Sequence, residues 1–219
     1  MKTIIKYELV INEALRSALN YDTPDEQINE FIRFFGKHIG SDRIYIFEDC
    51  DEKHVTKNTY EWCADGIVPE IHELQNVDMD IIGWWYQAFG SEKNIIITDI
   101  EQIKDEHRES YNLLKAQNVK NLVVCPIRYK DEIKGFFGVD NPPESDTLGL
   151  TTFLDMIGTL LISLLKLRNS FTKSNKEAML SSYSSLSSIY ISMALVNVQT
   201  HRYHIVKTLD EVVHFLGVK

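Results

Sequence analysis

The chain has 219 residues, of which 44% are hydrophobic and 25% are charged, as in an ordinary globular protein. Its formal net charge of −9 argues against nucleic-acid binding and against docking on anionic membranes, because both surfaces repel an acidic chain. The length exceeds that of a typical domain of about 100–150 residues, so we expect one full domain and a further segment.

The cysteines and the apolar segments indicate a cytoplasmic protein. Cys50, Cys63 and Cys125 are odd in number and lack CxxC spacing, which favours a reducing compartment over a disulfide framework. The most apolar stretch, residues 156–165, is about half as long as the ~20 residues that a membrane-spanning helix needs. The N-terminus lacks a signal-peptide pattern. We therefore expect no membrane segment.

Residues 1–20 are expected to form an N-terminal helix. Ile5, Leu9, Leu15 and Leu19 lie near one stripe at helical spacing. This stripe is the surface that we expect to be buried.

A second helix has clear start and stop signals. Thr23 and Glu26 have the spacing of a capping box, and Pro24 suits the first helical position. Gly40 is a typical residue after the end of a helix. The sequence therefore predicts a helix from about residue 24 to residue 39.

Strand-like runs and further helices follow in a mixed order. Residues 43–48 and 55–64 are predicted to form one antiparallel hairpin, and residues 119–129 and 132–140 a second one. Between the hairpins we expect a helix around residues 80–89, a short strand at 94–98 and a helix over 99–117. This order predicts an α+β fold with an antiparallel sheet.

A long helix is predicted from residue 148, with a linker to residue 180. Its apolar positions alternate by four and three, which is typical of a coiled-coil seam. The seam can pack on the domain's own sheet or pair with a second copy, and the two can coexist. The seam residues are Phe153, Ile157, Leu160, Leu164, Leu167 and Phe171.

The last segment, residues 181–219, begins with a serine-rich joint and is predicted to hold a hairpin and the start of a helix. It is too short for a core of its own. We interpret it as the beginning of a further domain.

Four stretches carry a family resemblance: TPDEQINEF (23–31), SDRIYIFE (41–48), TYEWC (59–63) and GFFGVDNP (135–142). In this order they resemble the GAF domains that precede diguanylate cyclase domains in bacterial signalling proteins. Residues 21–147 are thereby identified as a GAF sensor domain, and residues 148–180 as a signalling helix. The segment 186–206 resembles the opening of a PAS-like domain, so 181–219 is expected to be a partial PAS-like segment.

The resemblance implies a six-stranded antiparallel sheet flanked by helices, with a ligand cavity between the sheet and the helical region. It also implies a homodimer that controls an attached output domain, a diguanylate cyclase. Bilin-binding GAF domains carry a cysteine followed by histidine, and no cysteine here precedes a histidine. The cyclase signature Gly-Gly-Asp/Glu-Glu-Phe is absent, so the chain itself is not expected to be the cyclase.

Metal chemistry has little support in the sequence. His201 and His204 lack a third ligand nearby, and Asp49, Asp51 and Glu52 are typical of an acidic turn. Nucleotide-binding, zinc-protease and serine-hydrolase motifs are missing. No cofactor is required by the sequence, and no metal site is expected.

Aromatic residues are the best candidates for a ligand site. Large rings with polar edges suit a small-molecule pocket, although the same residues also suit a filled core. Polar contacts at the edge of the pocket are expected from three further residues. The candidate ligand-binding residues are Tyr60, Trp62, Trp84, Trp85, Tyr111, Gln117 and Asp140.

Three functions are compatible with these observations. The first is a non-catalytic sensory module that binds a small molecule or dimerises to control an output domain. The second is a cysteine-dependent enzyme that uses Cys63 or Cys125, as some GAF domains do when they reduce methionine sulfoxide. The third is a dimerisation module with a filled core and no ligand.

Overall fold

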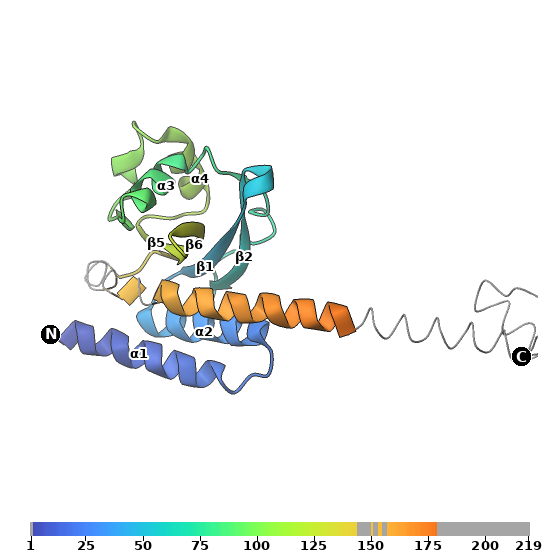
Figure 1. The fold of residues 1–219 in the computed structure, drawn as a ribbon. Coiled ribbons are helices and arrows are strands. Elements are labelled where there is room, and N and C mark those ends of the chain that lie inside the picture. The colour runs from blue at the N-terminus through green and yellow to red at the C-terminus, as the bar shows by residue number, and fades with distance from the viewer. Residues whose placement is uncertain (1, 144–149, 151–152, 155–156, 179–219) are drawn as a thin grey trace, which may run out of the picture. The chain divides into compact units, whose positions relative to one another are not determined.

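Six strands form one antiparallel sheet in the order β3-β2-β1-β6-β5-β4 (Figure 1). The computed structural model describes residues 2–143, 150, 153–154 and 157–178, and residues 1–168 form one unit. The six-stranded sheet with flanking helices confirms the predicted α+β fold. The strands are β1 (Arg43–Cys50), β2 (Val55–Cys63), β3 (Val77–Asp78), β4 (Ile95–Ile97), β5 (Leu122–Tyr129) and β6 (Glu132–Asp140).

Both predicted hairpins are present, and each carries an irregularity. β1 pairs with β2, and the register shifts between Ile46 and Phe47. β5 pairs with β6, and the register shifts between Ile127 and Arg128. A short 3-10 turn, η1 (Asp51–Lys53), connects β1 to β2. The two-residue edge strand β3 was not predicted, because it is too short to leave a periodic signal.

Helix α2 (Pro24–Ile39) begins and ends where the sequence predicts. The Thr23 side chain accepts a hydrogen bond from the Glu26 backbone N–H, and the Glu26 carboxylate accepts one from the Thr23 backbone. Gly40 follows the helix in the left-handed conformation, which glycine adopts without steric cost. The capping box is therefore confirmed.

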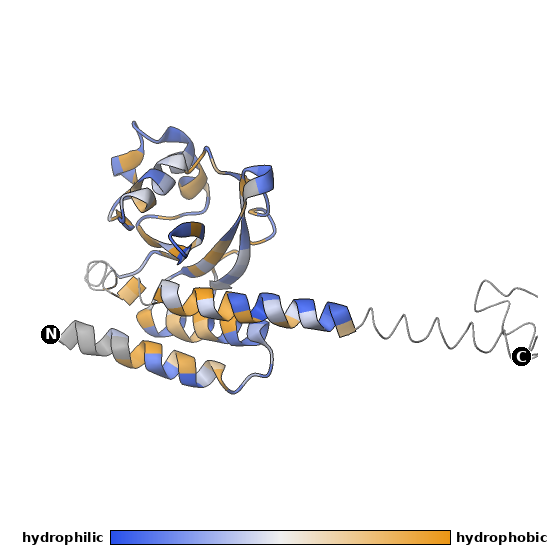
Figure 2. Cartoon of the chain, in the orientation of Figure 1, coloured by the Kyte–Doolittle hydropathy of each residue, from blue (hydrophilic) through white to orange (hydrophobic). Residues whose placement is uncertain are grey.

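The sheet is buried on both faces because its side chains alternate. Ile44 and Ile46 of β1 point into one core, together with α1, α2 and the C-terminal helix. Tyr45 and Phe47 point into the other core, beneath the helices between β3 and β5. Figures 1 and 2 show these helices on opposite sides of the sheet, with apolar residues on the sides that face it.

Helix α1 (Lys2–Ala18) is present, but its buried stripe differs from the predicted one. Tyr7, Ile11, Ala14 and Ala18 are at most 4% exposed, whereas Leu9 is 60% exposed and Leu19 75% exposed. The prediction of the stripe was wrong because it followed the largest aliphatic residues. The small alanines lie on the buried side, where they let α1 approach its neighbours closely.

The region between the hairpins contains more breaks than predicted. The expected helix 80–89 is α3 (Gly83–Gly90). The single helix expected over 99–117 is two elements, η2 (Ile100–Ile103) and α4 (Arg108–Ala116). Ile100 and Ile103, three residues apart, both point into the core, and a 3-10 turn aligns positions at that spacing.

The C-terminal helix is helical over residues 157–178, and also at 150 and 153–154. Phe153 and Ile157 of the predicted seam are buried in the core of the domain. Leu160 and Leu164 are partly buried beside that core. Leu167 is 52% exposed and Phe171 is 41% exposed. The predicted seam is therefore split, and the fully buried stripe runs instead through Leu150, Leu154, Ile157, Leu161 and Leu165.

The predicted PAS-like segment 181–219 lies outside the described residues. Among the residues that are described, no helix has the length and apolar character needed to cross a bilayer.

Gly135 is the position where the sheet tolerates no side chain. Its φ is +141°, and a Cβ there would lie 1.9 Å from the Phe47 carbonyl oxygen. We predict that Gly135→Ala lowers the free energy of unfolding by about 2–5 kcal/mol, because it adds backbone strain and a steric clash.

The control is Gly90→Ala at the end of α3, where a Cβ would meet no atom within 4 Å. This change should leave stability unaltered or raise it by up to about 1 kcal/mol. Urea unfolding of both variants measures the difference, and equal stabilities would contradict the prediction.

Candidate functional site

A small hollow lies between the sheet and the helices α3 and α4. Its volume is about 40 Å³, which is room for a few water molecules at most. An adjoining hollow of about 110 Å³ shares Arg43, Gln117 and Asp140 with it. The walls of the first hollow, called the cavity below, are Arg43, Tyr45, Phe47, Asn58, Glu61, Leu74, Val77, Ile82, Trp85, Leu113, Leu114, Gln117, Phe136 and Asp140.

A β-bulge directs Asn58 to the cavity. Simple alternation along β2 would place Asn58 on the same face as Tyr60. The register shift leaves Thr59 without a partner, so that Tyr60 pairs with Ile46 and Asn58 pairs with Phe47. Asn58 therefore lines the cavity, and Tyr60 faces the opposite core. Bulges commonly re-aim a side chain in this way.

Arg43 is the polar centre of the cavity wall and is 3% exposed. Its Nη1 donates to Asp140 Oδ2 at 3.2 Å, and its Nη2 donates to the Val68 carbonyl at 2.8 Å. Its Nε lies 3.3 Å from Glu61 Oε1. One guanidinium therefore holds together β1, β2, β6 and the loop after β2.

Glu61 fixes that loop from the other side. Its Oε2 accepts the backbone N–H groups of Glu70 and Ile71, at 2.9 and 3.0 Å. Its Oε1 accepts from Asn58 Nδ2 at 3.3 Å. These hydrogen bonds replace the water that the buried carboxylate has lost.

Asp140 has an unusual protonation equilibrium. Burial raises its pKa to about 7, against the opposing effects of the Arg43 charge and of the polar Tyr45 hydroxyl nearby. The pKa of Arg43 is raised as well, since its two carboxylate neighbours outweigh the effect of burial. The two pKa shifts are consistent with each other. Two carboxylates act on the single guanidinium of Arg43 and raise its pKa, whereas that shared guanidinium does not offset the burial of Asp140.

Stability should therefore depend on pH through Asp140. The folded protein holds this proton up to about pH 7, whereas the unfolded chain loses it near pH 4. Folding thus binds a proton between these values, so the free energy of unfolding falls as pH rises, by at most about 1.4 kcal/mol per pH unit. We predict that Asp140→Asn removes this part of the pH dependence, measured by urea unfolding from pH 4 to pH 8.

Asp131→Asn, at the exposed β5–β6 turn, is the matched control and should follow the wild-type profile. If wild type and Asp140→Asn showed parallel profiles across this range, the raised pKa would be refuted.

Three of the seven predicted ligand residues line the cavity: Trp85, Gln117 and Asp140. Trp84 and Tyr111 lie on the same side of the sheet but are engaged elsewhere. Trp84 stacks on His107 at 4.1 Å and donates to Ser110 Oγ at 2.9 Å. The Tyr111 hydroxyl donates to Glu101 at 2.9 Å.

Tyr60 and Trp62 lie on the opposite face of the sheet, so the expected grouping of these rings with Trp85 is wrong. Both pack against the core beneath α2. Trp62 lies against the bare backbone of Gly36, where a Cβ would come within 2.2 Å of its ring. Their cross-strand partners, Ile44 and Ile46, fix this face.

Sequence reasoning missed Arg43, Tyr45, Asn58, Glu61 and Phe136. A signal for Arg43 was available. Arg43 opens one strand and Asp140 closes another, and a charge at the end of an otherwise apolar strand needs a partner. The bulge that exposes Asn58 to the cavity had no signal in the sequence.

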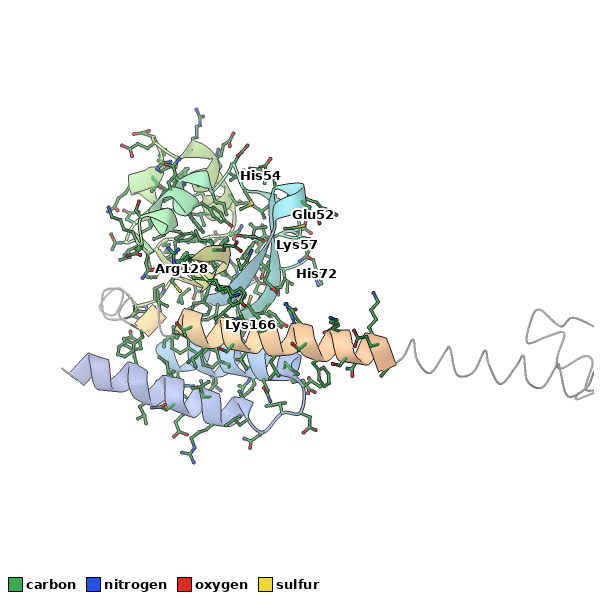
Figure 3. All side chains as sticks on the ribbon, viewed as in Figure 1. Glu52, His54, Lys57, His72, Arg128 and Lys166 are labelled. Atoms are coloured by element: carbon green, nitrogen blue, oxygen red, sulfur yellow. The ribbon has the colours of Figure 1, made fainter. Side chains whose placement is uncertain are left out.

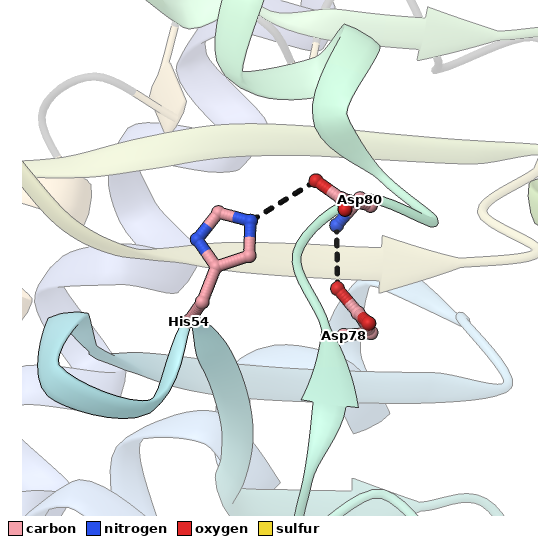
Figure 4. A group of neighbouring side chains, drawn as sticks. All are labelled: His54, Asp78 and Asp80. Atoms are coloured by element: carbon pink, nitrogen blue, oxygen red, sulfur yellow. Dashed lines mark hydrogen bonds and ion pairs between the residues drawn. The ribbon is translucent and has the colours of Figure 1, made fainter.

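Two other features are weaker candidates. His54, Asp78 and Asp80 are exposed and place their ligand atoms within 4.8 Å of one another (Figure 4). His54 already pairs with Asp80 at 3.0 Å, which raises the pKa of the imidazole. All three side chains are exposed, and exposed acidic groups are common without an ion. A solvated ion pair accounts for this group.

The second feature is a hollow of about 350 Å³ near Arg128 and Gly158. It is larger than the cavity, but it is open and polar. None of the buried unpaired atoms found in the described part of the chain belongs to its walls.

The face of the sheet opposite the cavity holds an ion-pair clamp to the C-terminal helix. Arg168 donates to both carboxylate oxygens of Glu48, at 2.8 and 2.6 Å, and to the Tyr60 hydroxyl at 3.2 Å. The Tyr60 hydroxyl donates in turn to Asp25. Lys166 lies 3.6 Å from the centre of the Tyr129 ring (Figure 3). Two cations of the helix thus contact side chains of β1 and β5.

Comparison with known proteins identifies the fold. No protein-family model matches the chain. A curated relative, the methanogenesis regulatory histidine kinase FilI of Methanothrix harundinacea, is 24% identical over 127 residues. The match covers 56% of this chain and 14% of the kinase, so the chain corresponds to a small part of that relative.

Solved GAF domains superpose over most of the chain. A phycocyanobilin-bound GAF domain from a cyanobacterial phytochrome has a TM-score of 0.56 and 17% identity, over 72% of this chain and 94% of its own. The GAF domain of an Acinetobacter phosphoenolpyruvate-protein phosphotransferase has a TM-score of 0.57 and 9% identity, over 76% and 97%. Free methionine-R-sulfoxide reductase from Neisseria meningitidis has a TM-score of 0.56 and 9% identity, over 76% and 92%. The sheet order, the helices on both faces and these superpositions establish that the chain has the GAF fold.

Proposed function

We propose that the chain is a non-catalytic sensory module that binds a small molecule in the cavity and transmits binding to the C-terminal helix. The observation that carries this proposal is the set of buried polar atoms without partners around the cavity. Asn58 Oδ1, Trp85 Nε1 and Asp140 Oδ1 make no hydrogen bond. Such atoms are costly unless a ligand uses them.

Strand β1 offers a direct route for the signal. Tyr45 and Phe47 line the cavity, and the next residue, Glu48, holds Arg168 of the C-terminal helix. A ligand that shifts β1 changes the geometry of this bidentate pair. Such a change can bias a two-state helix only if the ligand binds the two arrangements with different affinity.

The size of the cavity excludes the chromophores of the phytochrome neighbours as ligands for this conformation. Pockets for drug-sized ligands measure about 300–1,000 Å³, several times the 40 Å³ of the cavity. A site that extends into the adjoining 110 Å³ hollow suits a ligand about the size of benzene, which fills about 150 Å³.

The cysteine arrangement disfavours the enzymatic alternative. Cys63 is in β2 and Cys125 is in β5, three strand spacings apart, or about 14 Å. A disulfide needs Cα atoms within about 7 Å, so these two cannot serve as an attacking and a resolving pair. Burial also raises the pKa of Cys63, which lowers the thiolate fraction.

The output domain is part of the proposal. We propose that the module acts in the cytoplasm and regulates a catalytic domain of a longer signalling protein. The family resemblance favours a diguanylate cyclase, and the FilI similarity favours a histidine kinase. In both cases the C-terminal helix connects the module to the catalytic domain.

The binding proposal can be tested with a panel of compounds of about six to ten non-hydrogen atoms, followed by NMR. We predict that binders shift the resonances of Tyr45, Trp85 and Phe136 and also the Arg168 Nε–H signal. Leu113→Phe, which fills the cavity from α4, should abolish both sets of shifts.

Glu48→Gln should keep the cavity shifts and lose the Arg168 shift, because it breaks the clamp without touching the cavity wall. Ile96→Phe, at an exposed position of β4, is the matched control for added volume. A panel without any binder at these residues, or binding that survives Leu113→Phe, would contradict the proposal.

Dimerisation through the C-terminal helix is a second part of the proposal. The half-exposed Leu167 and Phe171 lie four residues apart on one side of the helix. We predict a dimer by light scattering, and a monomer for the double variant Leu167→Glu/Phe171→Glu. Leu9→Glu on α1, equally exposed, is the control. A monomeric wild type, or a dimeric double variant, would refute this part.

A further inference from the structure

The unpaired polar atoms of the protein are concentrated at the cavity. Five buried side-chain atoms lack a hydrogen bond among the described residues. Four of the five belong to cavity residues: Arg43, Asn58, Trp85 and Asp140. Each of these residues is at most 3% exposed, so bulk water does not satisfy them. The concentration indicates that one ligand group meets several of these atoms together.

The chemistry of the open positions is mixed. Asn58 Oδ1 and Asp140 Oδ1 are acceptors, and Trp85 Nε1 is a donor. The Tyr45 hydroxyl faces the Asp140 carboxylate, but no donor meets hydrogen-bond distance and angle at Oδ1. Arg43 Nε is already close to Glu61. A complementary ligand therefore brings N–H donors and at least one acceptor.

Charge excludes anionic ligands. The guanidinium of Arg43 is already shared between Glu61 and Asp140, so a carboxylate or phosphate would lie beside two acidic side chains and find no free cation. A purely cationic ligand suits the carboxylates but leaves the Trp85 N–H without an acceptor. An uncharged group that both donates and accepts satisfies all the open positions.

The walls favour a flat apolar body over water. Trp85, Phe47, Tyr45 and Phe136 surround one side of the cavity. The rings of Phe47 and Phe136 are stacked at 4.7 Å, and Trp85 meets Phe136 edge-on at 5.5 Å. An aromatic wall favours stacking with a planar ligand.

We infer that the cavity, together with the adjoining hollow of about 110 Å³, binds a small uncharged ligand with a carboxamide-type group on a flat apolar body. Its two N–H donors face Asn58 Oδ1 and Asp140 Oδ1, and its carbonyl oxygen accepts from Trp85 Nε1. The size limit is about six to ten non-hydrogen atoms. This inference rests on the proposed sensory function and names the class of ligand.

Benzamide, benzoate and benzamidinium test the inference, because they have the same shape and differ in charge and in hydrogen-bonding groups. NMR titration of the intact chain near neutral pH measures the three affinities. We expect benzamide to bind at least about tenfold more tightly than either ion, because each ion leaves a buried polar group without a matching partner.

Trp85→Phe provides the internal check, since it keeps a ring and removes the donor. It should weaken benzamide about tenfold and leave benzamidinium unchanged. Trp84→Phe is the matched control, because the Trp84 N–H already has Ser110 as its acceptor. If Trp85→Phe does not fold, the affinities of the three probes for the wild-type chain still test the inference.

Equal or tighter binding of benzoate or benzamidinium at the cavity overturns the inference. The inference is also overturned if other fragments bind in the cavity and benzamide does not. In that case the sensory proposal stands. If no fragment and none of the three probes shifts a cavity resonance, both fail, and the cavity holds water only.

Discussion

The buried guanidinium of Arg43 is the interaction on which the cavity depends. It joins the end of β6 to β1 and, through Glu61 and Val68, to the loop after β2. Breaking a buried ion pair by removing one partner costs far more than the pair contributes, because the remaining charge is left without water. The network therefore fixes the shape of this wall. Burial raises the pKa of Asp140 to about 7, because the shared Arg43 charge does not offset the loss of solvation.

The sheet serves two environments at once. On β1, Tyr45 and Phe47 line the cavity, while Ile44 and Ile46 support α2 and the C-terminal helix. Alternation places Glu48 on the helix side, directly after a cavity residue. A displacement of Phe47 on the cavity face is thus only one residue away from Glu48 on the helix face. This geometry is the basis of the proposed coupling between the cavity and the Glu48–Arg168 pair.

The solved neighbours show how little the fold alone says about ligands. Similar sheets hold a bilin in a cyanobacterial phytochrome and belong to an enzyme in Neisseria meningitidis. Differences in side chains, and not in topology, separate these cases. In this chain the cavity is small, its walls are aromatic, and its cysteines are too far apart to pair. These local features, together with the unpaired polar atoms, carry the functional argument.

The sequence by itself determined the capped start of α2, both hairpins and the antiparallel sheet, because these follow from local periodicity and turn chemistry. It also indicated Trp85, Gln117 and Asp140. Only the tertiary structure decided which face each strand residue occupies. The bulge at Thr59 reverses the alternation, so that Asn58 enters the cavity and Tyr60 leaves it. The bare backbone of Gly36 receives Trp62 on the far side. A one-residue register shift leaves no periodic signal in the sequence, yet it reverses every side chain beyond it.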